Sequence, residues 1–145
     1  ARFDFYAVRP RTLLHGRILY DTVFERFYMA CSRLTEIPVV FYRTATGIEP
    51  VREWLRSLPE ADRRTIGLDL AAVQVGWPVG MPLCRPLSGG LWEVRSTLPS
   101  RRIARVLFFV HEGRLGVVHG FIKKTQKTPP DDLALARKRM QEMTV

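Results

Sequence analysis

The chain has 145 residues, of which 46% are hydrophobic and 26% are charged, and its formal net charge is +9 at pH 7. This length is enough for one domain with a hydrophobic core and too short for two domains of ordinary size. The composition excludes an intrinsically disordered chain, and the basic excess favours nucleic acid or an acidic protein as the binding partner.

The positive charge is unevenly distributed along the chain. Residues 85–127 contain nine basic and two acidic side chains, a net charge of +7 that leaves +2 for all other residues. This distribution disfavours a generically basic protein, because the charge gathers where hydrophobic patterns predict strands. Cations on half-buried strands are costly unless a partner needs them, so we expect a phosphate-binding surface.

The sequence indicates no disulfide framework, structural zinc site or membrane span. Cys31 and Cys84 belong to no CxxC motif and have no neighbouring ligand cluster. No apolar run approaches the length needed to cross a bilayer. Acidic residues interrupt the Arg-rich N-terminus, which makes it a poor secretory signal. We therefore expect a cytoplasmic protein without a membrane partner.

The first 36 residues differ from the rest, because they lack a sustained hydrophobic period of either kind. We interpret residues 1–36 as an N-terminal extension, with a helix around residues 21–32, in front of a main domain at residues 37–145. An upstream start codon would explain such an extension, and Met29 is then the candidate for the true start.

Residues 38–76 predict a strand followed by two helices. The run Pro38–Arg43 is β-branched and aromatic, as is typical of strands. Pro50 suits the first position of a helix. The hydrophobic residues after it recur at i, i+3, i+4 and i+7, namely Val51, Trp54, Leu55 and Leu58. A second helix, at residues 59–76, buries Ile66, Leu70 and Val73.

Residues 77–90 are rich in proline and glycine, which predicts a loop. Three strands follow, at residues 91–97, 102–111 and 115–123, with short connections that favour antiparallel hairpins. A last helix starts near Pro130 and has an apolar stripe of Leu133, Ala136 and Met140. The order β-α-α-β-β-β-α predicts an α+β fold, with a small and mainly antiparallel sheet covered on one face by helices. The opposite face is then open to a ligand.

Alternation along the predicted strands sorts side chains onto the two faces of the sheet. The simplest assembly places one set on the open surface: Arg95, Arg105, His119 and Lys123. Along the third strand, Val117 shares the face of His119. A slip of one residue in the strand register would reverse this assignment. Trp92 falls on the helix-covered face, where we interpret it as a core residue, with base stacking as the alternative.

Five strings of residues resemble a known family. VVFYRTATG, VREWLRSLP, GLWEVR, IARVLFF and HGFIKKTQKTP are closely similar to the phage-derived Gp49-like branch of the HigB/RelE toxin superfamily, over residues 37–142. The last string is the most specific, because a strand followed by F-x-K-K-x-x-K-T-P is unusual. The resemblance implies a RelE-like fold and the toxin of a type II toxin–antitoxin system, an mRNA interferase that inhibits translation.

The resemblance also implies the reaction and the partners. Toxins of this superfamily are metal-independent endoribonucleases without a cofactor, and they commonly cleave mRNA on the ribosome. A neighbouring helix-turn-helix antitoxin, HigA-like in this branch, neutralises the toxin. The ribose 2′-OH is the nucleophile, so negative charge that develops on the phosphate oxygens needs fixed cations.

The resemblance assigns these cations residue by residue. Arg105 in RVLF matches the arginine that the superfamily places against the scissile phosphate, and Arg95 in WEVR matches the basic position of the preceding strand. Lys123 and Lys124 match the basic position at the end of the last strand. The resemblance does not extend to Arg101, Arg102 and Lys127, which we interpret as peripheral RNA contacts that position the backbone without reading its sequence.

Each of the two candidate proton-transfer groups, His119 and Glu93, has two interpretations. His119 is a general base or acid, since imidazole titrates near neutrality, or it is a packed and hydrogen-bonded histidine of the sheet. Glu93 is a general base or the salt-bridge partner of Arg95 or Arg105. Some superfamily members use a C-terminal Tyr or His, and this chain has neither after His119.

Three functions compete on this sequence. An endoribonuclease toxin is the main prediction. A non-catalytic nucleic-acid-binding or phage accessory protein with the same fold stays open, because the C-terminal Tyr or His is missing. A module that binds an acidic protein is the third, and salt sensitivity alone does not separate it from RNA binding.

Overall fold

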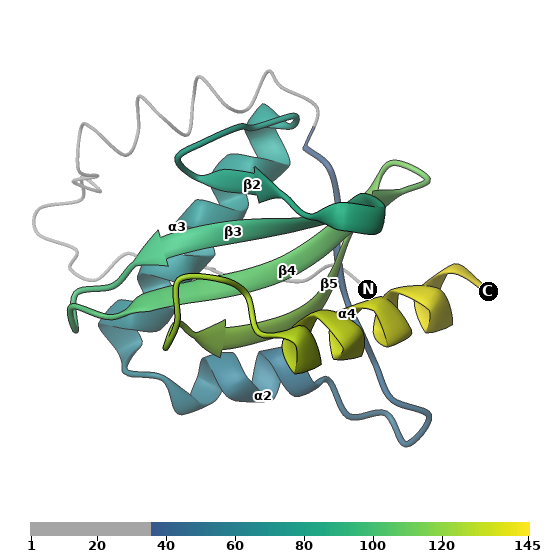
Figure 1. The fold of residues 1–145 in the computed structure, drawn as a ribbon, viewed down its shortest axis with the longest axis horizontal. Coiled ribbons are helices and arrows are strands. Elements are labelled where there is room, and N and C mark those ends of the chain that lie inside the picture. Colours follow the sequence, from purple (N-terminus) through teal and green to yellow (C-terminus); the bar gives the residue numbers. More distant parts are fainter. Residues whose placement is uncertain (1–35) are drawn as a thin grey trace, which may run out of the picture. The chain divides into compact units, whose positions relative to one another are not determined.

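A five-stranded sheet forms the centre of residues 36–145, the part of the chain that the computed structural model describes (Figure 1). Its strands lie in the order β1-β5-β4-β3-β2. They are β1 (Val39–Phe41), β2 (Cys84–Pro86), β3 (Leu91–Thr97), β4 (Ile103–His111) and β5 (Arg114–Ile122). Only β1 and β5 pair in parallel, and the other neighbours are antiparallel. The predicted α+β class with a mainly antiparallel sheet is confirmed.

Three α-helices accompany the sheet within the described residues: α2 (Pro50–Ser57), α3 (Glu60–Gly76) and α4 (Pro130–Thr144). Pro50 begins α2, because its fixed φ suits the first turn of a helix. The Leu58–Pro59 step separates α2 from α3, since a residue before proline disfavours helical dihedrals. Residues 1–35 of the expected N-terminal extension, with its helix and Met29, lie outside the described residues.

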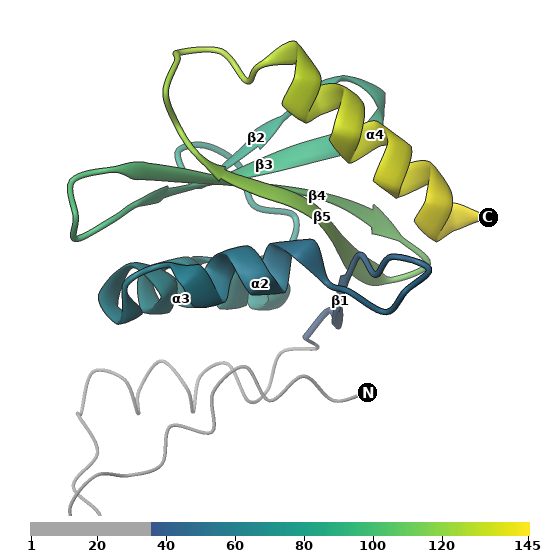
Figure 2. The ribbon, with the colours of Figure 1, turned by 90° about the horizontal axis from the view of Figure 1, so that it is seen from below.

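One face of the sheet is covered by α2 and α3 (Figure 2). The side chains that these helices bury are those the sequence predicts: Val51, Leu55, Ile66, Leu70 and Val73. Trp92 lies on this face in edge-to-face contact with Trp77, with 4.8 Å between the ring centroids. That contact agrees with the interpretation of Trp92 as a core residue.

The second face is not open, contrary to the sequence prediction, because α4 packs on it (Figure 2). Ala136 of α4, with Met140 and Met143 beside it, lies against a buried cluster of Leu91, Leu107, Phe109 and Val118. An amphipathic helix needs an apolar surface for its stripe, and these residues provide one on the face that α2 and α3 leave free. Helices therefore cover both faces of the sheet.

A bulge in β5 changes one predicted face assignment. Phe108 pairs with Val117 and Leu107 pairs with His119, so Val118 is an extra residue between them. Val117 consequently lies on the α2/α3 face and not beside His119. An extra residue reverses the alternation along a strand, and nothing in the hydrophobic pattern marks its position.

The short strand β2 is the element that the sequence analysis assigns to a loop. It pairs with β3 at the edge of the sheet, with Arg85 opposite Glu93. Pro86 is tolerated there, since an edge strand has one side without ladder hydrogen bonds. Residues opposite one another share a face of the sheet. Arg85 therefore lies on the same face as Glu93.

Candidate nucleic-acid interface

The strand register brings four of the predicted site residues to the α4 face of the sheet. Arg95 lies opposite Arg105, and Leu107 lies opposite both Glu93 and His119. Because opposite residues share a face, the predicted common face of Arg95, Arg105 and His119 is confirmed. Only the half around Leu107 lies under α4. The half around Arg105 lies under the segment Lys123–Thr128, which we call the lysine loop.

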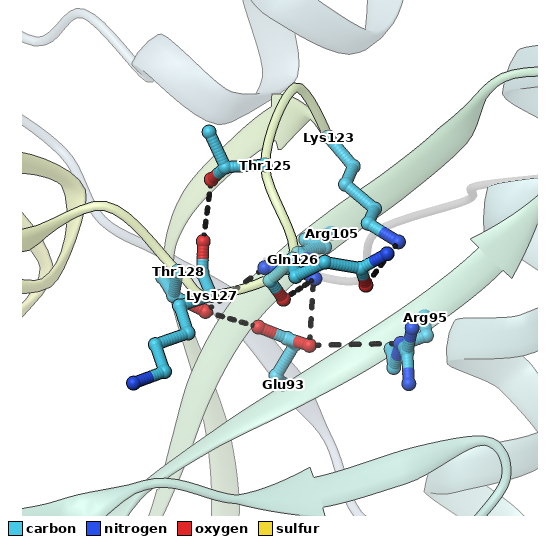
Figure 3. A network of polar contacts seen from close by, with 8 residues as sticks. All are labelled: Glu93, Arg95, Arg105, Lys123, Thr125, Gln126, Lys127 and Thr128. Atoms are coloured by element: carbon cyan, nitrogen blue, oxygen red, sulfur yellow. Dashed lines mark hydrogen bonds and ion pairs between the residues drawn. The ribbon is translucent and has the colours of Figure 1, made fainter.

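Arg105 and Glu93 are fully buried, and Arg105 Nε lies 3.5 Å from Glu93 Oε1. The prediction of an arginine on an open face is therefore wrong. The physical reason is the lysine loop, which turns back over this part of the sheet (Figure 3). A buried guanidinium persists only where its charge and its N–H groups find partners.

The lysine loop supplies the remaining partners of this ion pair. Arg105 Nη2 donates to the Gln126 carbonyl oxygen at 2.7 Å, and Arg105 Nη1 donates to Thr128 Oγ1 at 3.3 Å. Thr128 Oγ1 in turn donates to Glu93 Oε2 at 2.6 Å. Figure 3 shows the resulting network, in which Thr128 connects the two charged side chains.

Arg95 approaches the same carboxylate from the exposed side. Its Nε lies 3.8 Å from Glu93 Oε1, and 27% of its side chain is exposed. Glu93 thus faces two guanidinium groups and one hydroxyl, which agrees with its interpretation as a salt-bridge partner. One carboxylate balances only one of the two positive charges, so the half-exposed Arg95 is available to an anion.

The lysine loop carries its ammonium groups toward the surface. Lys124 and Lys127 are exposed, and the Lys127 side chain points away from Glu93 (Figure 3). Lys123 is half-buried, and its Nζ donates to Gln126 Oε1 at 3.3 Å. Together with Arg95, these lysines form a set of accessible cations around a buried ion pair.

His119 is paired with Asp132, a residue that the sequence analysis does not single out. His119 Nε2 lies 2.7 Å from Asp132 Oδ1, and the two side chains are 15% and 27% exposed. Asp132 lies in the first turn of α4, so this contact joins the helix to β5. A carboxylate on one ring nitrogen orients an imidazole and selects its tautomer. The pair therefore suits either a structural or a proton-transfer role.

Arg101 and Arg102 lie apart from this group, in the connection between β3 and β4. Arg102 Nη2 lies 3.2 Å from Asp62 Oδ2 on α3, so its guanidinium is directed toward the α2/α3 face. Hydrogen bonding by Ser100 and then by Arg102 holds the pKa of Asp62 below its ordinary value, although burial opposes this. Arg101 is exposed, with a left-handed φ of 62°.

The structure adds four residues to the predicted site: Arg85, Gln126, Thr128 and Asp132. Arg85 escaped the sequence analysis because Pro86 and the neighbouring glycines favour a loop. Thr128 stands inside the F-x-K-K-x-x-K-T-P string, which is the one sequence signal that could have drawn attention to it. Gln126 acts through its backbone carbonyl and its side chain, and no sequence pattern reports a carbonyl contact.

Three further features of residues 36–145 concern metal ligands, the cysteine thiol and the helices. Within them, no three His, Cys, Asp or Glu side chains lie close enough to hold a metal ion. Burial raises the pKa of the Cys84 thiol to about 11, which leaves little thiolate at neutral pH. None of the helices in this range has the length and apolar character needed to cross a bilayer.

The fold and the site define a small, basic α+β protein with accessible cations grouped around one half of its sheet. The model of the family "Phage derived protein Gp49-like (DUF891)" matches residues 53–141. The chain therefore belongs to the Gp49-like family, a RelE/HigB-like toxin family, as the resemblance implied. No curated protein matches the chain.

Proposed function

We propose that this protein is the toxin of a type II toxin–antitoxin system, a metal-independent endoribonuclease that cleaves mRNA on the ribosome and thereby inhibits translation. The family and the net charge of +9 support this proposal. The observation that carries it is the grouping of Arg95, Lys123, Lys124 and Lys127 on one side of the sheet, within reach of solvent.

These accessible cations suit the charge that RNA cleavage develops. Attack of a 2′-OH on the adjacent phosphorus concentrates negative charge on the non-bridging oxygens, and prearranged cations stabilise it. Arg95 is suited to a bidentate phosphate contact, whereas the lysines act as mobile point charges. Arg101 and Arg102 then serve as outlying contacts to the RNA backbone.

His119 is the proton-transfer group in this proposal, with Asp132 as the carboxylate that orients it. The 2.7 Å contact engages Nε2, which leaves Nδ1 for exchange with substrate or water. Glu93 has two guanidinium groups and the Thr128 hydroxyl around a buried carboxylate. It therefore acts as a charge-balancing group and not as the base.

The proposed partners follow from the same function. A RelE/HigB-like toxin implies an antitoxin, and we propose a HigA-like helix-turn-helix protein encoded beside this gene. mRNA and the ribosome are the proposed targets, in the cytoplasm. An acidic surface on the antitoxin would complement the accessible cations and compete with RNA for them.

A non-catalytic nucleic-acid-binding protein is the second candidate, and one observation favours it. Arg105, the arginine that the resemblance assigns to the scissile phosphate, is fully buried and engaged by Glu93, Gln126 and Thr128. In this arrangement its guanidinium is closed to a ligand. A binding protein would need only the accessible cations.

Induction of the chain in bacteria, alone and with the neighbouring gene, tests the proposal when mRNA 5′ ends are mapped. We expect growth arrest and new 5′ ends that the neighbour suppresses, and loss of both effects in Arg95→Ala. Arg64→Ala is the matched control, because Arg64 is an exposed cation on α3 that pairs with Glu60. Binding of purified RNA without new 5′ ends would favour the second candidate.

A further inference from the structure

Beyond its first residue, the lysine loop has no backbone hydrogen bonds to hold it. Lys123 N donates to the Ile103 carbonyl at 2.7 Å, and the next such bond is made by Leu133 N in the first turn of α4. Between them, no backbone–backbone hydrogen bond involves residues 124–128 in the described part of the chain. The position of this loop therefore depends on side-chain contacts.

Those contacts converge on the buried ion pair beneath the loop. Arg105 holds the loop at the Gln126 carbonyl, and Thr128 holds it through Glu93. A second, smaller group of bonds lies within the loop itself, where Thr125 Oγ1 donates to the Lys127 carbonyl at 2.7 Å. The loop is thus attached to the sheet at Gln126 and Thr128, on either side of Lys127.

Thr128 is the point where the two attachments meet. Its hydroxyl donates to Glu93 and accepts from Arg105, so both its hydrogen and a lone pair are used. Bonds to charged groups are stronger than those between neutral groups. Glu93 is fully buried, so loss of the Thr128 hydroxyl would leave Glu93 Oε2 without this donor in a site closed to water.

We infer that Thr128 is a positioning residue: it joins the buried Arg105–Glu93 pair to the lysine loop and so sets where Lys124 and Lys127 meet an RNA phosphate. This inference rests on the proposed function, and it makes Arg105 a support of the phosphate-binding loop instead of a direct phosphate contact. Prearranged cations bind a phosphate without a further cost of ordering the chain, so a loosened loop binds more weakly.

The test compares the full wild-type chain with two variants of nearly the same size. Thr128→Val keeps the β-branched shape and removes the hydroxyl, whereas Thr128→Ser keeps the hydroxyl and removes a methyl group. Limited digestion with trypsin measures the rate of cleavage after Lys124 and Lys127 within the loop, and fluorescence anisotropy measures affinity for a short single-stranded RNA. Urea unfolding verifies that each variant is folded.

We expect trypsin to cleave the loop of Thr128→Val at least about tenfold faster, and we expect this variant to bind the RNA about tenfold more weakly, with Thr128→Ser close to wild type. Unchanged loop cleavage in Thr128→Val would overturn the inference, as would faster cleavage with unchanged RNA affinity. Wild-type protein that binds no RNA would overturn the proposed function, and the inference with it.

A third variant separates support from direct contact at Arg105. Arg105→Lys keeps the positive charge but cannot make all three contacts at once. A supporting arginine predicts faster cleavage of the loop by trypsin, a higher KM for cleavage of the RNA and a smaller change in kcat. A large loss of kcat with unchanged trypsin cleavage and KM would identify Arg105 as the phosphate contact and overturn the inference.

Discussion

Arg105 and Glu93 form a fully buried ion pair on the α4 face of the sheet, with 3.5 Å between Nε and Oε1. Two charges removed from water are tolerated because each has further partners: Arg105 in Gln126 and Thr128, and Glu93 in Thr128 and Arg95. The pair joins the sheet to the lysine loop. Substitution of Arg105 is therefore expected to affect the stability of the fold.

Arg105→Ala should destabilise the fold strongly. Removal of Arg105 leaves the buried Glu93 carboxylate with only Thr128 and the more distant, half-exposed Arg95. Loss of one partner of a buried ion pair costs about 3–5 kcal/mol in the free energy of unfolding. Urea unfolding followed by circular dichroism measures this. Arg95→Ala is the control, because that half-exposed arginine faces the same carboxylate and should cost about 1 kcal/mol or less. Equal losses in both variants would contradict the assigned burial.

Arg85→Ala should weaken RNA binding without affecting stability. The register of β2 places Arg85 opposite Glu93, so this exposed residue extends the accessible cations to the sheet edge. Removal of one phosphate contact should reduce the slope of log affinity against log salt by about 0.7–0.9. Titrations of single-stranded RNA at several salt concentrations measure the slope, with Arg64→Ala on α3 as the charge-matched control. The same slope in both variants would exclude Arg85 from the interface.

His119→Gln should lower the rate of RNA cleavage by about 10²–10⁴-fold if the imidazole transfers the proton. Asp132→Asn should lower it less, since the amide oxygen still accepts a hydrogen bond while the orienting charge is lost. Single-turnover cleavage measures both rates, and thermal unfolding measures stability. A purely structural pair predicts the opposite pattern, in which stability falls and the rate per folded molecule is unchanged.

Asp62→Asn should destabilise the protein at neutral pH more than in acid. Hydrogen bonding by Ser100 and Arg102 lowers the folded-state pKa of Asp62 below the ordinary value of 3.8. A lowered folded pKa adds stability that is fully present above that value and is lost as pH falls through the folded pKa. The difference in unfolding free energy between wild type and variant should therefore shrink below about pH 4. A difference that is constant from pH 7 to pH 2 would contradict this.

Gly120→Ala should destabilise the domain by overpacking. A Cβ at position 120 would clash with the ring of Trp54, which reaches β5 from α2. Such crowding costs about 1–3 kcal/mol in a packed core. Gly80→Ala is the matched control, because nothing lies within 4 Å of its Cβ position. Thermal or urea unfolding of the two variants should differ clearly, and similar values would contradict the Trp54–Gly120 packing.

Much of the fold could be predicted because its signals are local. The apolar stripe of α3, the proline that begins α2 and the alternation in β3 and β4 each depend on residues within one element. Two features could not be predicted, because they depend on pairing between elements and not on residues within one element. β2 is a strand by virtue of its pairing with β3, although its own sequence ends in proline, and the β5 bulge is set by the pairing with β4.

In the candidate site, too, the local features could be predicted and the long-range contacts could not. Alternation alone placed Arg95, Arg105 and His119 on a common face, and the strand register confirms it. The partners of these residues come from far along the chain, however. Thr128 meets Glu93 across 35 positions, and Asp132 meets His119 across 13. No periodicity reports contacts of that range.

The sequence by itself determined the basic charge, the order of most elements, the faces of the residues of β3, β4 and β5 outside the bulge, and the family. Only the tertiary structure decided which of those cations are accessible. Alternation states which side of a sheet a side chain points to, but not what covers that side. Coverage depends on the path of α4 and the lysine loop. Because the lysine loop lies over Arg105, this residue is buried and not exposed as the sequence predicted.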